Sequence, residues 1–277
     1  MVGTESQPST YVTEINRWRQ TKDDSLRAED GWLSLIGLFW LPEGANTVGA
    51  NPKSDIPIDA AGVPDQLGTI EFHDGQATLQ ISADAPVTVD GVLNTHAVLR
   101  DDNAEAGPSL VKIGSVSFFV IRRGDAFGVR VRDANNPARL TFTGRNWFPI
   151  APQYQVKGTF VVHDTPRTIP IVNASGQTEM VDNPGKVEFE LGGQALSLEA
   201  FAAGKDELWF VFKDATSAQS TYGAGRFMYA PVNADGVVSL DFNKAYHPPC
   251  AFTPYSTCLR PPKENILPVE VLAGERD

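Results

Sequence analysis

Hydrophobic positions recur at helical spacing near the start of the chain and predict one amphipathic helix over residues 11–22. The residues on one face of that helix are Tyr11, Ile15, Trp18 and Lys22. Ser9 or Thr10 can supply the oxygen that caps the first turn. The polar run that starts at Asp23 is expected to end the helix.

An apolar run interrupted by glycine follows, Asp30-Gly-Trp-Leu-Ser-Leu-Ile-Gly-Leu-Phe-Trp-Leu41. A helix needs about 20 apolar residues to cross a bilayer, so this run is too short to be a membrane span. It predicts a buried strand pair or a segment that crosses the core. No other stretch of the chain is longer and as apolar, so we expect no membrane partner.

From Pro42 onward, short segments of alternating hydrophobic and polar residues are separated by turn signals. The turns pair Gly with Asp, Ser or another Gly, as tight hairpins do. They are Asp74-Gly75, Asp90-Gly91, Gly124-Asp125, Ser175-Gly176, Gly192-Gly193 and Asp235-Gly236. This spacing predicts a mainly β fold of sandwich or barrel type, with no second long helix.

The chain divides most naturally near Asn135-Asn136-Pro137. We expect an N-terminal helix and apolar segment over 1–41, a β-sandwich lobe over 42–135, and a second antiparallel β lobe over 136–277. Prolines favour extended backbone, so the Pro-rich tail is expected to wrap the second lobe as extended chain. Its last buried strand should contain Ile266, Leu267, Val269 and Val271.

Composition and charge narrow the class of partner. The chain has 277 residues, a net charge of −11 and a pI near 4.8, which argues against a nucleic-acid surface and against docking on anionic membrane. The first residues are polar and lack a secretory signal, so we expect a cytoplasmic protein. Two cysteines are too few for a disulfide scaffold.

Several ordered runs resemble the domain of unknown function 1684 family, whose activity is unknown. They are the 30–41 run, Asp214-Ala-Thr216, Thr221-Tyr-Gly-Ala-Gly-Arg-Phe227, Asp241-Phe-Asn243, Pro248-Pro-Cys-Ala-Phe252, Glu264-Asn265 and Ala273-Gly-Glu275. The family pattern has Asn before Pro-Pro-Cys, whereas this chain has His247.

The N-terminal half also resembles a forkhead-associated (FHA) β-sandwich in strand order. The matching runs are Asn46-Thr-Val-Gly49, Asp55-Ile-Pro-Ile58, Val87-Thr-Val-Asp-Gly91 and Lys112-Ile-Gly-Ser-Val-Ser-Phe-Phe119. FHA domains read phosphothreonine with an Arg after the first Gly, and here Ala50 follows Gly49. The resemblance implies an FHA-like sandwich without phosphopeptide reading.

The densest cluster of polar residues follows the apolar strand Leu208-Trp-Phe-Val-Phe212. Arg226 is placed to clamp a carboxylate or phosphate, and the glycines beside it let backbone approach a ligand closely. Asp214, Thr221 and Tyr222 complete this candidate binding site. The alternative is structural: Arg226 pairs with Asp214 or Asp241 and joins two strands.

A second cluster runs from Asp241 to Cys250. Asp241 and Asn243 are expected on one side of a strand, with His247 as a base beside Cys250. We take Asp241, His247 and Cys250 as catalytic candidates and Asn243 as a ligand-binding one. The plainer interpretation of Cys250 and Cys258 is buried structural thiols, with a disulfide or zinc ligands as alternatives. Cys-x7-Cys is not a usual zinc spacing, so no metal site is predicted.

Two arginines on an expected strand form a third candidate. Arg130 and Arg132 alternate with valines, so their guanidinium groups should project from one sheet face and can hold an anionic ligand. Ion pairing with nearby acids such as Asp133 is the plainer interpretation.

These patterns predict a protein that binds, and in one version transforms, a small polar or anionic organic ligand in a pocket of the C-terminal lobe. No motif implies a cofactor, and whether the protein is an enzyme stays open. One alternative is a thiol-dependent enzyme or redox protein that uses Cys250 and His247. Another is a non-catalytic interaction module with an apolar patch around Trp32 and Trp40.

Overall fold

The structure is a computed structural model that describes residues 10–277, apart from the side chain of residue 166. It contains two compact units, which we name the N-terminal lobe and the C-terminal lobe. The N-terminal lobe consists of Leu26–Phe142 and Thr253–Ser256, and the C-terminal lobe of residues 10–25, Thr143–Phe252 and Thr257–Asp277. The predicted division into residues 1–41, 42–135 and 136–277 stays a prediction.

Helix α1 (Thr10–Arg27) is longer than the predicted helix over 11–22. The polar residues expected to end it lie inside it, because their side chains bond within the helix; the Ser25 hydroxyl, for example, donates to the Thr21 carbonyl at 2.8 Å. Thr10 is its first helical residue, and the other capping candidate, Ser9, lies outside the described residues.

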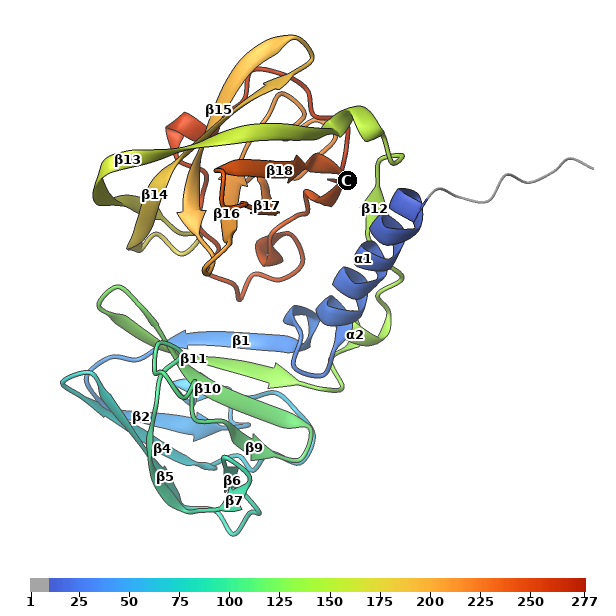
Figure 1. Ribbon diagram of the computed structural model, residues 1–277. Helices are drawn as coiled ribbons and strands as arrows, with labels where there is room; N and C mark the ends of the chain where they lie inside the picture. Colours follow the sequence, from blue (N-terminus) through green and yellow to red (C-terminus); the bar gives the residue numbers. More distant parts are fainter. Residues whose placement is uncertain (1–9) are drawn as a thin grey trace, which may run out of the picture. The chain divides into compact units, whose positions relative to one another are not determined.

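The N-terminal lobe contains two sheets (Figure 1). One has the order β1-β11-β10-β9-β6-β7, formed by β1 (Leu35–Trp40), β6 (Thr88–Val89), β7 (Val92–Leu93), β9 (Val111–Ile113), β10 (Val116–Arg123) and β11 (Ala126–Asp133). The other has the order β3-β2-β4-β5-β8, formed by β2 (Gly44–Gly49), β3 (Ile56–Pro57), β4 (Gly68–His73), β5 (Gln76–Ile81) and β8 (His96–Leu99). Pairing is antiparallel except between β2 and β3.

The apolar run over 30–41 forms one strand rather than a strand pair. A short 3₁₀ turn (Trp32–Ser34) leads into β1, which pairs with β11. Alternating residues of the lobe's strands, such as Ile70 on β4 and Phe118 on β10, are fully buried and form the lobe's core. The alternation of apolar and polar residues along each strand therefore determines which side of the strand faces the core. A four-residue helix, α2 (Pro137–Leu140), follows β11.

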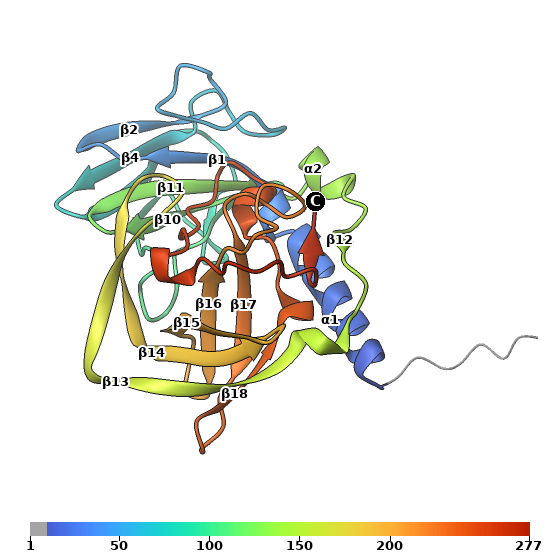
Figure 2. The same ribbon diagram turned by 90° about the horizontal axis from the view of Figure 1, so that it is seen from above.

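The C-terminal lobe is built on one nearly closed, barrel-like sheet with the order β17-β16-β15-β14-β13-β18. An isolated bridge between Val232, after β17, and Val238 on β18 brings the two ends of the sheet together. Figure 2 shows the long β13–β14 hairpin curving beside β15, β16 and β17. The strands are β13 (Gln155–Val172), β14 (Thr178–Leu191), β15 (Gln194–Ala202), β16 (Glu207–Phe212), β17 (Arg226–Pro231) and β18 (Val237–Asp241).

Short elements connect and finish this lobe. A two-stranded sheet pairs β12 (Asn146–Trp147) with β19 (Glu275–Arg276), near the end of the chain. The remaining elements are 3₁₀ turns at Pro152–Tyr154, Phe242–Lys244, Pro249–Ala251 and Lys263–Asn265.

The tail contains 3₁₀ turns at Pro249–Ala251 and Lys263–Asn265, and the predicted last strand over residues 266–271 does not form. Only an isolated bridge joins Ile266 to Lys213, and Ile266 is exposed while Leu267 is buried. The side chain of Asn265 takes over the backbone pairing that a strand would supply. It accepts from the Glu199 N–H and donates to the Glu199 and Val211 carbonyls.

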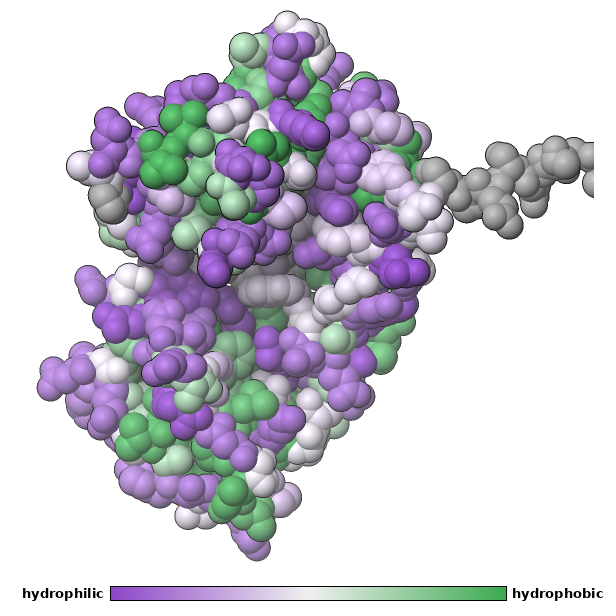
Figure 3. Space-filling view, in the orientation of Figure 1, coloured by the Kyte–Doolittle hydropathy of each residue, from purple (hydrophilic) through white to green (hydrophobic). Residues whose placement is uncertain are grey.

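The mainly β prediction is confirmed: one N-terminal helix accompanies antiparallel sheets. In the described part of the chain, no helix is both long and apolar enough to cross a membrane. On the face shown in Figure 3, hydrophilic residues predominate and apolar ones are scattered in small areas. Of the two tryptophans expected in an apolar interaction patch, Trp40 is exposed and Trp32 half-buried, so the interaction module stays a prediction.

Candidate functional site

Arg226, predicted to clamp a ligand, is fully buried at the start of β17. Its Nη2 lies 2.7 Å from Asp214 Oδ2, and neither side chain has exposed surface. The remaining Nη donors bond to the Val271 and Ala273 carbonyls of the tail. The Arg226 guanidinium has no exposed surface in this structure, and its pair with Asp214 is the one that the structural alternative describes. The pair joins β17 to the turn after β16.

Asp214 and Thr221 belong to the same buried network. Asp214 Oδ1 accepts from the backbone and the hydroxyl of Thr216 at 2.9 and 2.6 Å, and the Thr216 hydroxyl contacts that of Thr221 at 2.9 Å. The Val271 N–H also donates to Asp214 Oδ1. Asp214, Thr216 and Thr221 are all buried. Their hydrogen bonds to one another stabilise the turn before β17.

His247 is buried, and both of its ring nitrogens have neighbours. Nε2 accepts the Tyr222 N–H at 3.2 Å, and Nδ1 lies 3.4 Å from Glu275 Oε1. Burial, together with Arg226 and Arg145, lowers the pKa of His247 to about 3. A neutral imidazole whose acceptor nitrogen is already occupied is poorly suited to take a proton from Cys250, so this geometry does not support His247 as the base.

Glu275 accepts hydrogen bonds from two directions. Its Oε2 lies 2.7 Å from both Arg145 Nη1 and the His247 backbone N–H. Burial raises the pKa of Glu275 to about 7, against the opposing effect of Arg145. The network places β19 beside the segment that carries His247.

Asp241 and Asn243 do meet, but not as neighbours on one strand face. β18 ends at Asp241, and Asn243 lies in the 3₁₀ turn that follows, where its N–H and Nδ2 both donate to Asp241 Oδ1 at 3.1 Å. The Tyr11 hydroxyl of α1 donates to the same oxygen at 2.9 Å. Asn243 also exchanges hydrogen bonds with the backbone of Ala151. These contacts attach α1 to the barrel.

Cys250 is the predicted catalytic residue that keeps exposed surface. It is half-buried, whereas Cys258 is buried, and both are free thiols. The Tyr222 hydroxyl donates to the Cys250 carbonyl at 3.0 Å, and the pKa of Tyr222 is raised to about 12, mainly by burial. Across the described residues, no group of three or more His, Cys, Asp or Glu side chains is arranged to hold a metal ion.

Arg130 and Arg132 lie on β11 and belong to the N-terminal lobe, whereas the other candidates belong to the C-terminal lobe. Arg130 is buried, with its guanidinium 5.1 Å from the Trp32 ring centroid. Arg132 lies over the Phe119 ring at 4.7 Å and lines a cavity of about 420 Å³ together with Lys112 and the acids Glu29 and Asp30. Its charge is therefore offset by neighbouring carboxylates.

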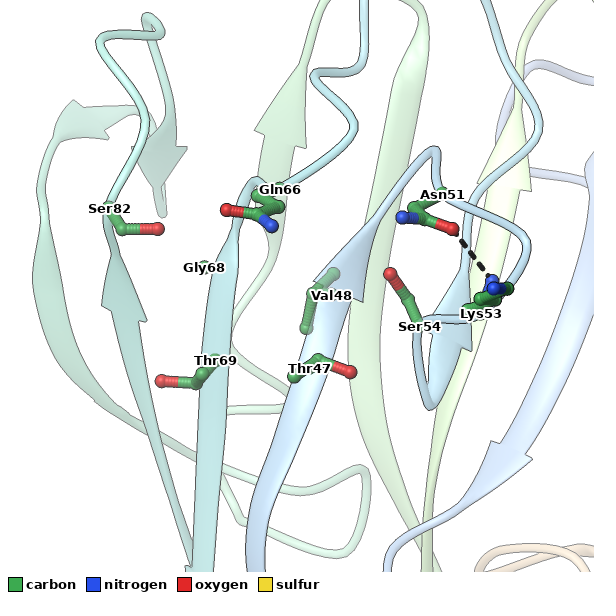
Figure 4. A pocket seen from close by; sticks show the side chains of 9 residues that line it. All are labelled: Thr47, Val48, Asn51, Lys53, Ser54, Gln66, Gly68, Thr69 and Ser82. Carbon is green, nitrogen blue, oxygen red and sulfur yellow. Dashed lines mark hydrogen bonds between the residues drawn. The ribbon is translucent and has the colours of Figure 1, made fainter.

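A second cavity of the N-terminal lobe, of about 350 Å³, lies at the ends of β2, β4 and β5. Figure 4 shows its polar side chains, among them Gln66, Thr69 and Ser82. Asn51 Oδ1 accepts a hydrogen bond from the Lys53 N–H, two residues along the chain, at 2.9 Å. Among the described residues that line this cavity, Lys53 is the one cation.

The C-terminal lobe holds a cavity of about 530 Å³ that the sequence did not predict. We call it the Lys22 cavity. It is lined by Trp18 and Lys22 of α1, Glu207 of β16, Tyr229 and Pro231 of β17, and Lys244 and Tyr246. One signal was present: Lys22 is the only charged member of the predicted apolar helix face.

Three aromatic rings surround the Lys22 ammonium. Nζ lies 4.1 Å from the Tyr246 ring centroid, 5.4 Å from that of Trp18 and 5.9 Å from that of Tyr229. Burial and the nearby Arg145 lower the pKa of Lys22, and Glu207 acts in the opposite direction. The Lys22 ammonium makes no hydrogen bond or ion pair with any described residue. Its three N–H donors therefore remain available.

Comparisons with known proteins give a family but no activity. The family described as "Protein of unknown function (DUF1684)" matches residues 140–276. The chain is 35% identical to an uncharacterized protein of Haloarcula marismortui solved by NMR, covering 50% of this chain and 79% of that one, with a TM-score of 0.43. No curated protein matches.

A second solved structure comes from a study titled as an analysis of phosphothreonine-dependent FHA domain interactions. It is 17% identical, covers 34% of this chain and 92% of that one, and has a TM-score of 0.25. The runs from Asp214 to Glu275 lie within the matched region, whereas the 30–41 run lies outside it. The resemblance is confirmed, and the chain belongs to the DUF1684 family of proteins of unknown function.

Proposed function

We propose that the protein binds a small organic anion with a planar apolar body in the Lys22 cavity. The observation that carries this proposal is the Lys22 ammonium, which is half-buried among aromatic rings and has no carboxylate or carbonyl partner among the described residues. A desolvated ammonium gains most from an anionic partner that replaces its lost water. The proposal keeps the predicted lobe and ligand class but replaces the predicted residues.

The charges around the cavity favour an anion over a cation. Lys22 and Lys244 both line it, and Glu207 is the one acid among the described residues of its lining. Arg145 is near enough to lower the pKa of Lys22. Lys244 lies 4.0 Å from Asp241 Oδ2, and Arg145 pairs with Glu275 and Asp23. Among the described residues, Lys22 is therefore the cation of the lining that has no carboxylate partner, and it would repel a cationic ligand.

The cavity walls favour a planar body. Tyr229 stacks nearly parallel to Trp209, at 6.2 Å and 19°, and Trp18 meets Tyr246 edge to face at 6.0 Å. These mutual contacts hold the rings in place without a ligand. A volume of about 530 Å³ lies in the range of roughly 300–1,000 Å³ typical of small-molecule sites. An aromatic carboxylate fits both the rings and the ammonium.

A matched ligand series tests the charge preference. Calorimetry or NMR titration with 2-naphthoate, the neutral 2-naphthamide and a naphthylmethyl-trimethylammonium ion compares three charges on one planar body. We expect the carboxylate to bind most tightly. Because a hydrogen bond to a charged group is worth about 1.5–3 kcal/mol, Lys22→Gln should weaken carboxylate binding by roughly tenfold or more.

Lys157→Gln is the control, because Lys157 is an exposed lysine on β13, outside the cavity lining. The affinity of the Lys157→Gln variant for the carboxylate should equal that of the wild type. Preference for the cation, or equal weakening in both lysine variants, would refute the proposal.

A further inference from the structure

The only two cysteines of the chain lie against each other in the C-terminal lobe. Cys250 lies in the 3₁₀ turn Pro249–Ala251 and is half-buried. Cys258 is 8% exposed and belongs to an apolar cluster on which Cys250 packs. The Cys250 N–H donates to Cys258 Sγ at 3.3 Å.

These contacts place the two residues within disulfide reach. The N–Cα bond is about 1.46 Å long, so Cys258 Sγ lies at most about 4.8 Å from Cys250 Cα given the 3.3 Å contact. A disulfide needs its Cα atoms about 4.4–6.8 Å apart. A Cys258 sulfur this close to the Cys250 backbone is compatible with that spacing, and rotation of the Cys250 side chain toward it is the movement that the disulfide requires.

The surroundings of Cys250 also favour the thiolate. The hydrogen bond from Cys258, with help from the Tyr222 hydroxyl and the charge of Arg260, lowers the pKa of Cys250 to about 7, although burial acts in the opposite direction. The thiolate is the reactive form of cysteine. A large fraction of Cys250 is therefore reactive at neutral pH, in a position that still has exposed surface.

We propose that Cys250 and Cys258 are a reversible redox pair that reacts with peroxides. The Cys250 thiolate attacks one peroxide oxygen, the O–O bond breaks, and sulfenic acid forms while the other oxygen leaves as hydroxide or alkoxide and takes up a proton. Cys258 Sγ then attacks the Cys250 sulfur, which forms the disulfide and releases water. A small dithiol reverses the change by donating two electrons and two protons.

In this scheme Cys250 is the attacking residue and Cys258 the resolving one, since only Cys250 is partly exposed. His247 takes no part, because its Nε2 accepts the Tyr222 N–H. The inference is independent of ligand binding in the Lys22 cavity, which shares none of these residues.

The wild-type protein tests the pair without any substitution. After a stoichiometric pulse of hydrogen peroxide, intact mass and peptide mapping should show an intramolecular Cys250–Cys258 disulfide, and dithiothreitol should restore both thiols. In the reduced protein, alkylation of Cys250 should rise with pH to half its maximum near pH 7. Alkylation with a midpoint above pH 8.5, or oxidation to sulfinic acid without a disulfide, would overturn the proposal.

Two serine variants assign the roles. Cys258→Ser should accumulate a Cys250 sulfenic acid that dimedone traps, with no disulfide within one chain. Cys250→Ser should give no dimedone adduct at the same peroxide dose. Circular dichroism verifies that both variants are folded, and a dimedone adduct on Cys258 in Cys250→Ser would contradict the assignment.

Discussion

Arg226 Nη2 and Asp214 Oδ2 form a salt bridge of 2.7 Å in which neither side chain is exposed to solvent. The pair connects β17 to the turn after β16, and both residues also bond to the tail between Val271 and Ala273. It is therefore a junction of three segments that are distant in the sequence. Removing either partner leaves an uncompensated buried charge.

We expect Asp214→Ala and Arg226→Met each to lower the free energy of unfolding by about 3–5 kcal/mol. The double variant should lose clearly less than the sum of the two, because neither charge remains unpaired. Urea denaturation of the four proteins measures the coupling. Additive losses would contradict a specific pair.

The contact between Tyr11 and Asp241 predicts how α1 is held on the barrel. Tyr11→Phe removes the hydroxyl that donates to Asp241 Oδ1 at 2.9 Å and should cost about 1.5–3 kcal/mol, as for a hydrogen bond to a charged group. Tyr255→Phe is the matched control, since its hydroxyl bonds to no described residue. Its unfolding free energy should change by less than about 0.5 kcal/mol. Equal effects of the two changes would argue against the contact.

The lowered pKa of His247 predicts a pH dependence with a definite sign. The imidazole takes up its proton near pH 6.5 when unfolded but only near pH 3 when folded, so it destabilises the fold progressively as the pH falls toward 3. Glu275 acts in the opposite direction. Its folded pKa of about 7 exceeds the ordinary 4.5, so its contribution to stability is lost as the pH rises from 4.5 through 7.

Between pH 4 and 3, below both pKa values of Glu275, its carboxyl is mostly protonated in both states, and the effect of His247 is separated from it. There the wild type should lose up to about 1.4 kcal/mol per pH unit more than His247→Asn does. His96→Asn, at an exposed histidine, should follow the wild type. Denaturation at several pH values gives the slopes, and parallel wild-type and His247→Asn curves would show that His247 is not held neutral.

Gly274 predicts a strong steric effect next to β19. Its φ is +79°, and an added Cβ would overlap the Ala245 carbonyl and lie 2.7 Å from the Phe242 oxygen. We expect Gly274→Ala to cost about 2–5 kcal/mol, from the left-handed backbone and the overlap together. Gly176→Ala has a similar φ of +86° and open space, so it should cost only about 1–2 kcal/mol. Thermal or urea unfolding compares the two.

The mainly β fold was readable because its determinants are local. Alternation of apolar and polar residues in segments such as Val187–Leu191, and turn pairs such as Asp235-Gly236, encode a strand or a hairpin within a few neighbouring residues. Predictions at the ends of elements were less accurate. The polar residues Asp23 to Ser25 resemble a helix end, but hydrogen bonds within α1 keep them helical.

The sequence also located the polar cluster from Asp214 to Cys258, because a dense set of unusual residues is visible without a structure. It did not determine what those residues do. Whether Arg226 faces solvent or Asp214 depends on burial and on contacts with the tail, some 45 residues away. The surroundings of Lys22 could not be predicted from the sequence either, because the rings around it come from α1, β17 and Tyr246, which are distant in the chain. Local pattern determines secondary structure, whereas only the packing of distant segments decides which polar groups are paired and which remain free.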